Sequence, residues 1–156
     1  MTARWWHVGI TVSDMDRSLA FYRDVVGMEL QADDMHVDGM EQFDALTNNA
    51  GSQLRVVWLN DGVFTLQLIQ YLNAGGTTLD LHHNNVGSPH LSFFVDDADA
   101  KYEQVRARGD VTVTSDVIQL GPTSRTFYVE DPDGLPVEFF CQQVGEPNVA
   151  PPNWPR

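Results

Sequence analysis

Residues 5–28, WWHVGITVSDMDRSLAFYRDVVGM, decide the fold, because they read as a strand followed by a helix. Apolar side chains alternate with others in the first part, so Val8 and Ile10 fall on one face of the strand and His7 falls on the other. Apolar residues then recur at intervals of three and four, which predicts an amphipathic helix that Gly27 ends. The segment therefore predicts an imidazole on the strand face that does not pack against the helix.

A second segment, residues 89–109 (PHLSFFVDDADAKYEQVRARG), repeats this arrangement. Asp14 lies seven residues after His7, and Asp97 lies seven residues after His90, so each helix begins at the same offset from a histidine. Runs typical of antiparallel strands follow each helix: QLRVVWL (53–59) and VFTLQLIQY (63–71), then TSRTFYV (123–129) and LPVEFFCQ (135–142). Each half is thus predicted as a strand, a helix and about three further strands, and two such halves can bury each other's exposed sheet faces.

The repeat divides the chain into a first module (1–72), a polar, Gly-rich linker (73–89), a second module (90–143) and a Pro-rich tail that we expect to be extended (144–156). The first module contains an insertion, residues 31–53, that has no clean period and no counterpart of equal length in the second module. A short helix around Glu41 to Leu46 is expected within it.

Composition excludes several classes of partner. The 156 residues include 22 acidic and 9 basic side chains, for a formal net charge of −13, which argues against a nucleic-acid or anionic-membrane surface. No stretch approaches the roughly 20 apolar residues that a membrane span needs, and the first residues carry no apolar signal core, so a cytoplasmic protein is expected. Cys141 lies in an apolar run and is predicted to be a buried structural thiol.

Four polar positions are related by the repeat. His7 and His90 are equivalent, and aligning residues 66–68 with 137–139 makes Gln67 equivalent to Glu138. A glutamate between apolar neighbours is costly to bury without a partner, so it should be exposed, paired or coordinated. Two imidazoles, one carboxylate and one amide oxygen make a suitable donor set for a divalent first-row metal.

The segments HVGITVSDMDRSLAFYRDVVGM, HLSFFVDDADA and RTFYVEDPDGLPVEFF resemble the vicinal oxygen chelate superfamily, the group of glyoxalases, bleomycin-resistance proteins and extradiol dioxygenases. The resemblance implies an α+β fold of two tandem βαβββ modules, whose curled mixed sheets surround a metal or ligand cavity. It implies one divalent metal (Mn, Co, Ni, Zn or Fe(II)) at His7, Gln67, His90 and Glu138. It also implies a homodimer, with modules paired within a chain or across subunits.

The main functional hypothesis is a glyoxalase-type isomerase, epimerase or lyase that acts on a small oxygenated substrate through a metal-stabilised enolate. Glu138 and Gln67 are its expected catalytic residues. Glu41, Asp44, His36 and Asp34 in the insertion are further candidates for the general base. The expected substrate-binding residues are Arg125, Trp58, Phe94 and Phe140. The scarcity of Lys and Arg argues against a coenzyme A or glutathione substrate, whose anionic groups would need basic partners.

Two alternatives stay open. An iron(II) extradiol-type ring-cleaving dioxygenase would use only His7, His90 and Glu138 as ligands, with Gln67 beside the substrate. Such an enzyme also needs an acid–base histidine and a tyrosine, and His82 and His83 are candidates for the histidine by residue type. A non-catalytic protein that sequesters a hydrophobic drug or metabolite in an aromatic cleft is the third hypothesis.

Overall fold

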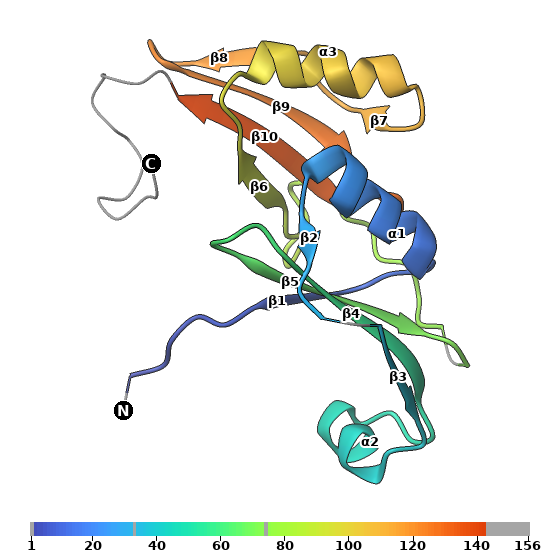
Figure 1. The fold of residues 1–156 in the computed structure, drawn as a ribbon. Coiled ribbons are helices and arrows are strands. Elements are labelled where there is room, and N and C mark those ends of the chain that lie inside the picture. Colours follow the sequence, from blue (N-terminus) through green and yellow to red (C-terminus); the bar gives the residue numbers. More distant parts are fainter. Residues whose placement is uncertain (1, 33, 74, 143–156) are drawn as a thin grey trace. The chain divides into compact units, whose positions relative to one another are not determined.

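The computed structural model describes residues 2–32, 34–73 and 75–142. The chain divides into two compact units, Met1–Thr78 and Leu79–Arg156, and the boundary falls in the segment that the sequence predicts as a linker. Each unit contains a mixed sheet of five strands, and neither sheet is closed among the described strands (Figure 1). The predicted α+β fold with two repeated modules is therefore confirmed at the level of element type and order.

The first unit is built on sheet A. Its elements are β1 (Val8–Thr11), α1 (Met15–Phe21), the π-helical turn η1 (Tyr22–Val26), β2 (Glu29–Leu30), β3 (Met35–Asp38), α2 (Glu41–Thr47), β4 (Gln53–Asn60) and β5 (Thr65–Tyr71). The strand order is β1-β5-β4-β2, and β3 also pairs with β4. Strand β1 runs parallel to β5, whereas the other pairs are antiparallel.

The second unit repeats this plan in sheet B. Its elements are β6 (Leu91–Phe94), α3 (Ala98–Arg108), β7 (Thr112–Val113), β8 (Ile118–Leu120), β9 (Ser124–Glu130) and β10 (Pro136–Gln142). The order β6-β10-β9-β7, with β8 also paired to β9, matches that of sheet A, and β6 again runs parallel to the last strand. The equivalence that the sequence predicts between the two halves therefore holds in strand pairing as well as in element order.

Both first helices begin and end as the repeat predicts. The Asp14 carboxylate accepts a hydrogen bond from the backbone N–H of Arg17, and the Asp97 carboxylate accepts from Asp99 and Ala100, as N-caps do. The helical segments end at Gly27 and Gly109, whose φ angles of 102° and 73° lie in the left-handed region that glycine adopts without strain. The capping aspartates and the terminating glycines are local sequence signals, and for this reason the sequence predicts both helices.

The insertion in the first unit holds more regular structure than the sequence predicts. Helix α2 lies in the insertion where a short helix was expected. Strand β3 also lies in the insertion and β2 lies just before it, and they bring the strands after α1 to four, where about three were expected. Both are short strands of mostly exposed residues that pair with β4, so they carry little hydrophobic periodicity. The expected extended tail falls outside the described residues, and within the described ranges no helix is both long enough and apolar enough to cross a membrane.

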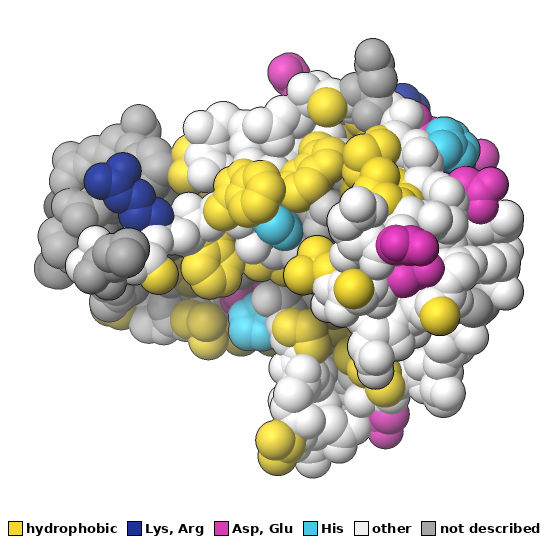
Figure 2. All heavy atoms as spheres, turned by 90° about the horizontal axis from the view of Figure 1, so that it is seen from below, with side chains coloured by type: hydrophobic (Ala, Val, Ile, Leu, Met, Phe, Trp, Pro, Cys, Tyr) yellow, Lys and Arg dark blue, Asp and Glu magenta, His cyan; other side chains and the backbone are white. Residues whose placement is uncertain are grey.

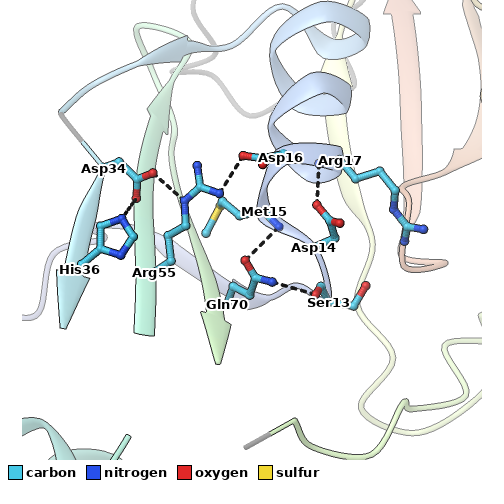
Figure 3. Close-up of polar contacts among 9 residues, drawn as sticks. All are labelled: Ser13, Asp14, Met15, Asp16, Arg17, Asp34, His36, Arg55 and Gln70. Atoms are coloured by element: carbon cyan, nitrogen blue, oxygen red, sulfur yellow. Dashed lines mark hydrogen bonds and ion pairs between the residues drawn. The ribbon is translucent and has the colours of Figure 1, made fainter. Parts of the chain in front are cut away.

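Each sheet has a helix face, which packs against α1 or α3, and an opposite face, here called the far face. On the helix face of sheet A, the Gln70 amide donates to the carbonyl of Ser13 and accepts from the backbone N–H of Met15 (Figure 3). Arg55, opposite Gln70 in the register, bonds Asp16 of α1 on the same face. Because side chains alternate along a strand, Gln67, three residues before Gln70, lies on the far face.

Candidate functional site

The far face of sheet A carries three residues in one row. Gly9, Gln67 and Trp58 are direct partners across β1, β5 and β4. Farther along this face, Val56 and Ile69 belong to an apolar cluster against which Phe43 of α2 packs. The insertion therefore covers one part of the far face, whereas the row with Gln67 lies beside the histidine that precedes β1.

His7 lies immediately before β1 in an aromatic setting. Its ring meets Trp58 edge-on with centroids 4.8 Å apart and meets Trp6 at 4.5 Å, and the two indoles stack at 5.5 Å. Nδ1 of His7 is buried and has no hydrogen-bond partner among the described residues. A buried polar atom without a partner is uncommon and calls for an explanation, such as an ion that the atom would bind.

Gln67 leans across β1 over a glycine. A Cβ atom placed on Gly9 would lie 3.2 Å from Oε1 of Gln67, closer than a comfortable contact. The absence of a side chain at Gly9 thus leaves room for the Gln67 amide on this face. Strand alternation predicts that Gln67 and His7 lie on one face. The register adds that Gly9, two residues after His7, is the direct partner of Gln67 on that face.

The second unit brings His90 and Glu138 together. Nε2 of His90 lies 3.8 Å from Oε2 of Glu138, and the two side chains are 47% and 14% exposed. The hydroxyl of Thr126 lies 2.8 Å from Oε1 of Glu138 and 3.1 Å from the carbonyl oxygen of Phe139. The carboxylate is therefore oriented through one oxygen by Thr126 and presents the other toward His90.

Two further side chains gather at this pair. Tyr128 is the direct partner of Glu138 across β9 and β10, and its ring centroid lies 5.8 Å from that of His90. His83 lies in the segment before β6, and its ring centroid is 4.8 Å from that of Tyr128 and 6.3 Å from that of His90. Burial raises the pKa of Tyr128, and the nearby Glu138 carboxylate raises it further. Sequence reasoning named His83 only by type and missed Tyr128, although its spacing from the next strand places it opposite Glu138.

The residues expected to bind substrate separate into two groups. Phe94 and Phe140 are register partners on the far face of sheet B, with ring centroids 6.0 Å apart, and Trp58 is half-buried on the far face of sheet A. Arg125 lies on the helix face instead, since it pairs with Cys141 in the register and its guanidinium bonds Asp99 of α3 at 2.6 Å. It therefore faces away from Glu138.

The candidate bases in the insertion have other roles or stand apart. His36 is the register partner of Arg55, which puts it on the helix face, and it lies 3.8 Å from Asp34 (Figure 3). Asp44 accepts backbone hydrogen bonds from Gly51 and Ser52 and so holds the loop after α2. Glu41 is exposed at the first residue of α2.

Taken by itself, each unit offers a pair of donors. No group of three or more His, Cys, Asp or Glu side chains gathers into a metal site anywhere in residues 2–32, 34–73 and 75–142. The first unit supplies an imidazole and an amide on its far face, and the second supplies an imidazole and a carboxylate. We call His7 with Gln67, and His90 with Glu138, the two half-sites.

Comparison with known proteins covers nearly the whole chain. The family model of the Glyoxalase/Bleomycin resistance protein/Dioxygenase superfamily matches residues 5–139. A lactoylglutathione lyase of Haemophilus influenzae is 32% identical over 137 aligned residues, and the match covers 86% of this chain and 89% of the relative. A 2-epi-5-epi-valiolone epimerase of an Actinomyces species is 31% identical over 149 residues, covering 90% and 80% of the two chains.

The fold is shared with solved structures as well. A glyoxalase family protein of Bacillus cereus superposes with a TM-score of 0.78 at 19% identity, over 91% of this chain and 95% of that one. Sequence, strand topology and structural likeness agree over both units. The chain therefore belongs to the Glyoxalase/Bleomycin resistance protein/Dioxygenase superfamily.

Proposed function

We propose that the protein is a divalent-metal-dependent isomerase, epimerase or lyase that acts on a small oxygenated substrate. One observation carries the proposal: each unit presents a histidine and an oxygen donor at equivalent places on its far face. These pairs are His7 with Gln67 and His90 with Glu138. In the proposal the two half-sites together hold one metal ion, with the units paired within one chain or across a homodimer.

The donors fit such an ion chemically. Neutral imidazole nitrogens and carboxylate or amide oxygens suit first-row divalent metals. The buried, unpartnered Nδ1 of His7 supports the fit, because a metal or its ligand would satisfy it. The contact of Thr126 with Glu138 supports it further, since residues that bind metal are commonly oriented by a second hydrogen bond.

In the proposed reaction, Glu138 takes a proton from the carbon beside a substrate carbonyl and returns a proton to the same carbon or to the neighbouring one. Thr126 holds one oxygen of this carboxylate, so the other oxygen, which faces His90, points to the place where the ion and the substrate would bind. Gln67 positions the substrate side of the site with its amide. A bound divalent ion supplies Lewis-acid stabilisation of negative charge on the substrate oxygens. The two relatives, a lactoylglutathione lyase and a 2-epi-5-epi-valiolone epimerase, support this class of reaction.

Metal binding tests the proposal. We expect the purified protein to bind Mn(II), Co(II), Ni(II), Zn(II) or Fe(II) with one ion per pair of half-sites and to gain thermal stability from it. His90→Ala and Glu138→Ala should lose tight binding and remain folded. His36→Ala, on the helix face, is the matched control and should keep it. If both site variants retain metal, the assignment of the site is wrong.

A specific observation favours a second candidate, the iron(II) ring-cleaving dioxygenase. Tyr128 and His83 lie beside His90 and Glu138, so this half-site offers a phenol and an imidazole in addition to the triad of His7, His90 and Glu138. Oxygen consumption with catechols under Fe(II) separates the two reactions. If the protein binds no metal at all, a non-catalytic binder of hydrophobic molecules replaces both.

A further inference from the structure

The described lysines and arginines lie on helices, on the helix faces of the sheets or in the segment before β1. Of the described basic residues, Arg17 and Arg23 lie on α1 and η1, Lys101, Arg106 and Arg108 on α3, and Arg55 and Arg125 on the helix faces of the sheets, while Arg4 precedes β1. Neither far face thus carries a lysine or arginine from its described strands.

Several of these cations are also held in place by carboxylates. Arg55 bonds Asp16 and Asp34, Arg125 bonds Asp99, and Arg108 bonds Asp110. Turning any of them toward a ligand on a far face would break an existing ion pair. Because the chain has a formal net charge of −13, the field around both half-sites is unfavourable for an anion.

The far face of sheet B is apolar beside Glu138. Phe140 follows Glu138 by two residues on the same face, Phe94 is its register partner, and Ile118 lies on that face across β9. The side chains of Phe94 and Ile118 are 44% and 50% exposed. Trp58 and Ile69 give sheet A a similar lining next to Gln67. In Figure 2, hydrophobic side chains gather in a broken band across the visible face, with histidine and acidic side chains beside them, and Lys or Arg show only toward its margins.

From this distribution we infer that the substrate is a small molecule without anionic groups, whose apolar part, a ring or a branched chain, lies against Phe94 and Phe140. The inference rests on the proposed function for the place where the oxygens of that molecule bind. An anionic conjugate would lose hydration on these faces and would gain no cationic partner from the described strands. The substrate class thus differs from the lactoylglutathione in the name of the lyase relative.

Three hydroxamates test the inference on the full-length protein loaded with Mn(II), because they share one chelating group with two adjacent oxygens. Acetohydroxamate has no ring, benzohydroxamate adds a phenyl ring, and 4-carboxybenzohydroxamate adds a carboxylate to that ring. We expect benzohydroxamate to bind about tenfold more tightly than acetohydroxamate, since its ring buries apolar surface. The carboxylated probe should bind about tenfold more weakly than benzohydroxamate.

A variant with a new cation on the far face sharpens the test. Phe94 lies on β6, at the edge of sheet B, where a lysine is tolerated. We expect Phe94→Lys to reverse the preference, so that the carboxylated probe binds more tightly than benzohydroxamate. Gln104→Lys places the same charge on an exposed residue of α3, on the opposite side of sheet B from Glu138, and should leave the wild-type preference unchanged.

The outcomes separate the inference from the proposed function. Mn(II)-dependent binding of all three probes with equal affinity, or with the carboxylated probe bound most tightly, overturns the inference alone. Binding without Mn(II) that keeps the preference for the neutral ring, and loses it in Phe94→Lys, supports the inference and contradicts the metal site. Absence of binding by every probe overturns both.

Discussion

Gly9 and Gln67 are direct partners across β1 and β5, and a Cβ atom on Gly9 would lie 3.2 Å from the amide oxygen Oε1 of Gln67. The pair links strand register to the first half-site, since the amide occupies space that any other residue at position 9 would fill. Gly9 is accordingly a positioning residue for Gln67.

The first prediction concerns Gly9→Ala. Gly9 has no positive φ, so alanine fits its backbone and should raise the free energy of unfolding by about 0.4–1 kcal/mol through the unfolded chain. The displaced amide should at the same time weaken metal affinity about tenfold. Calorimetric titration with Mn(II) and urea unfolding measure the two effects. Thr11→Ala, on the same face two residues further along β1, is the control and should keep the wild-type metal affinity. If Gly9→Ala also keeps the wild-type affinity, the role of Gly9 is contradicted.

Thr126→Val tests the orientation of Glu138. The substitution keeps the shape of the side chain and removes the hydroxyl that lies 2.8 Å from Oε1 of Glu138. We expect metal affinity or kcat to fall by about tenfold to a hundredfold, because such supporting bonds fix the binding residue. Stability should fall by only about 1 kcal/mol. Thr126→Ser restores a hydroxyl and should recover most of the loss; failure of serine to recover it would point to packing instead.

Much of the fold could be predicted because the two halves carry the same local signals. Asp14 and Asp97 cap their helices, and both helices end at a glycine with positive φ. Alternation placed His7, Gln67 and Glu138 on the far faces, since that depends only on parity along a strand. Helix capping, helix termination and strand alternation are local properties, so they can be predicted from neighbouring residues alone.

The rest of the candidate site depends on contacts between segments that are distant in the sequence. Tyr128 reaches Glu138 through the β9–β10 register, and His83 reaches Tyr128 from a segment without regular structure. Arg125 was expected to bind substrate, yet its odd spacing from Tyr128 and its bond to Asp99 place it on the helix face. The direction of the Arg125 side chain depends on the bounds of β9 and on its register with β10.

Arg125→Met separates a structural role from a substrate-binding role. Because the guanidinium bonds Asp99 on the helix face, we expect a small loss of stability and an unchanged order of affinity for the three hydroxamates. Asp99→Asn should lower the free energy of unfolding by a similar amount. The double variant should lower it by less than the sum of the two single effects, as expected for a coupled pair. If Arg125→Met, but not Asp99→Asn, changes the order of affinity for the three hydroxamates, Arg125 binds substrate after all.

The last prediction concerns pH and Asp80, which holds the turn that carries His83. Oδ1 of Asp80 accepts a hydrogen bond from the backbone N–H of His82 at 3.0 Å, and this bond, with a further one from Asn85, lowers the pKa of the carboxyl group. A lowered pKa in the folded protein means that the charged form stabilises the fold. This contribution is fully present above the unfolded pKa of about 3.9 and is lost as the pH falls through the lower folded value.

The comparison of wild type with Asp80→Ala isolates this contribution. The difference between their free energies of unfolding should be constant from about pH 5 to pH 7 and should shrink below about pH 4, as wild type loses its charged carboxylate. Urea unfolding at pH 7 and at pH 3 measures it. Because His83 lies beside Tyr128, the variant should also alter the tyrosine environment, which near-ultraviolet circular dichroism at pH 7 reports. A stability difference that grows on acidification would mean that Asp80 is stabilised in its protonated form, and its bond to the His82 N–H would then not be what holds the turn.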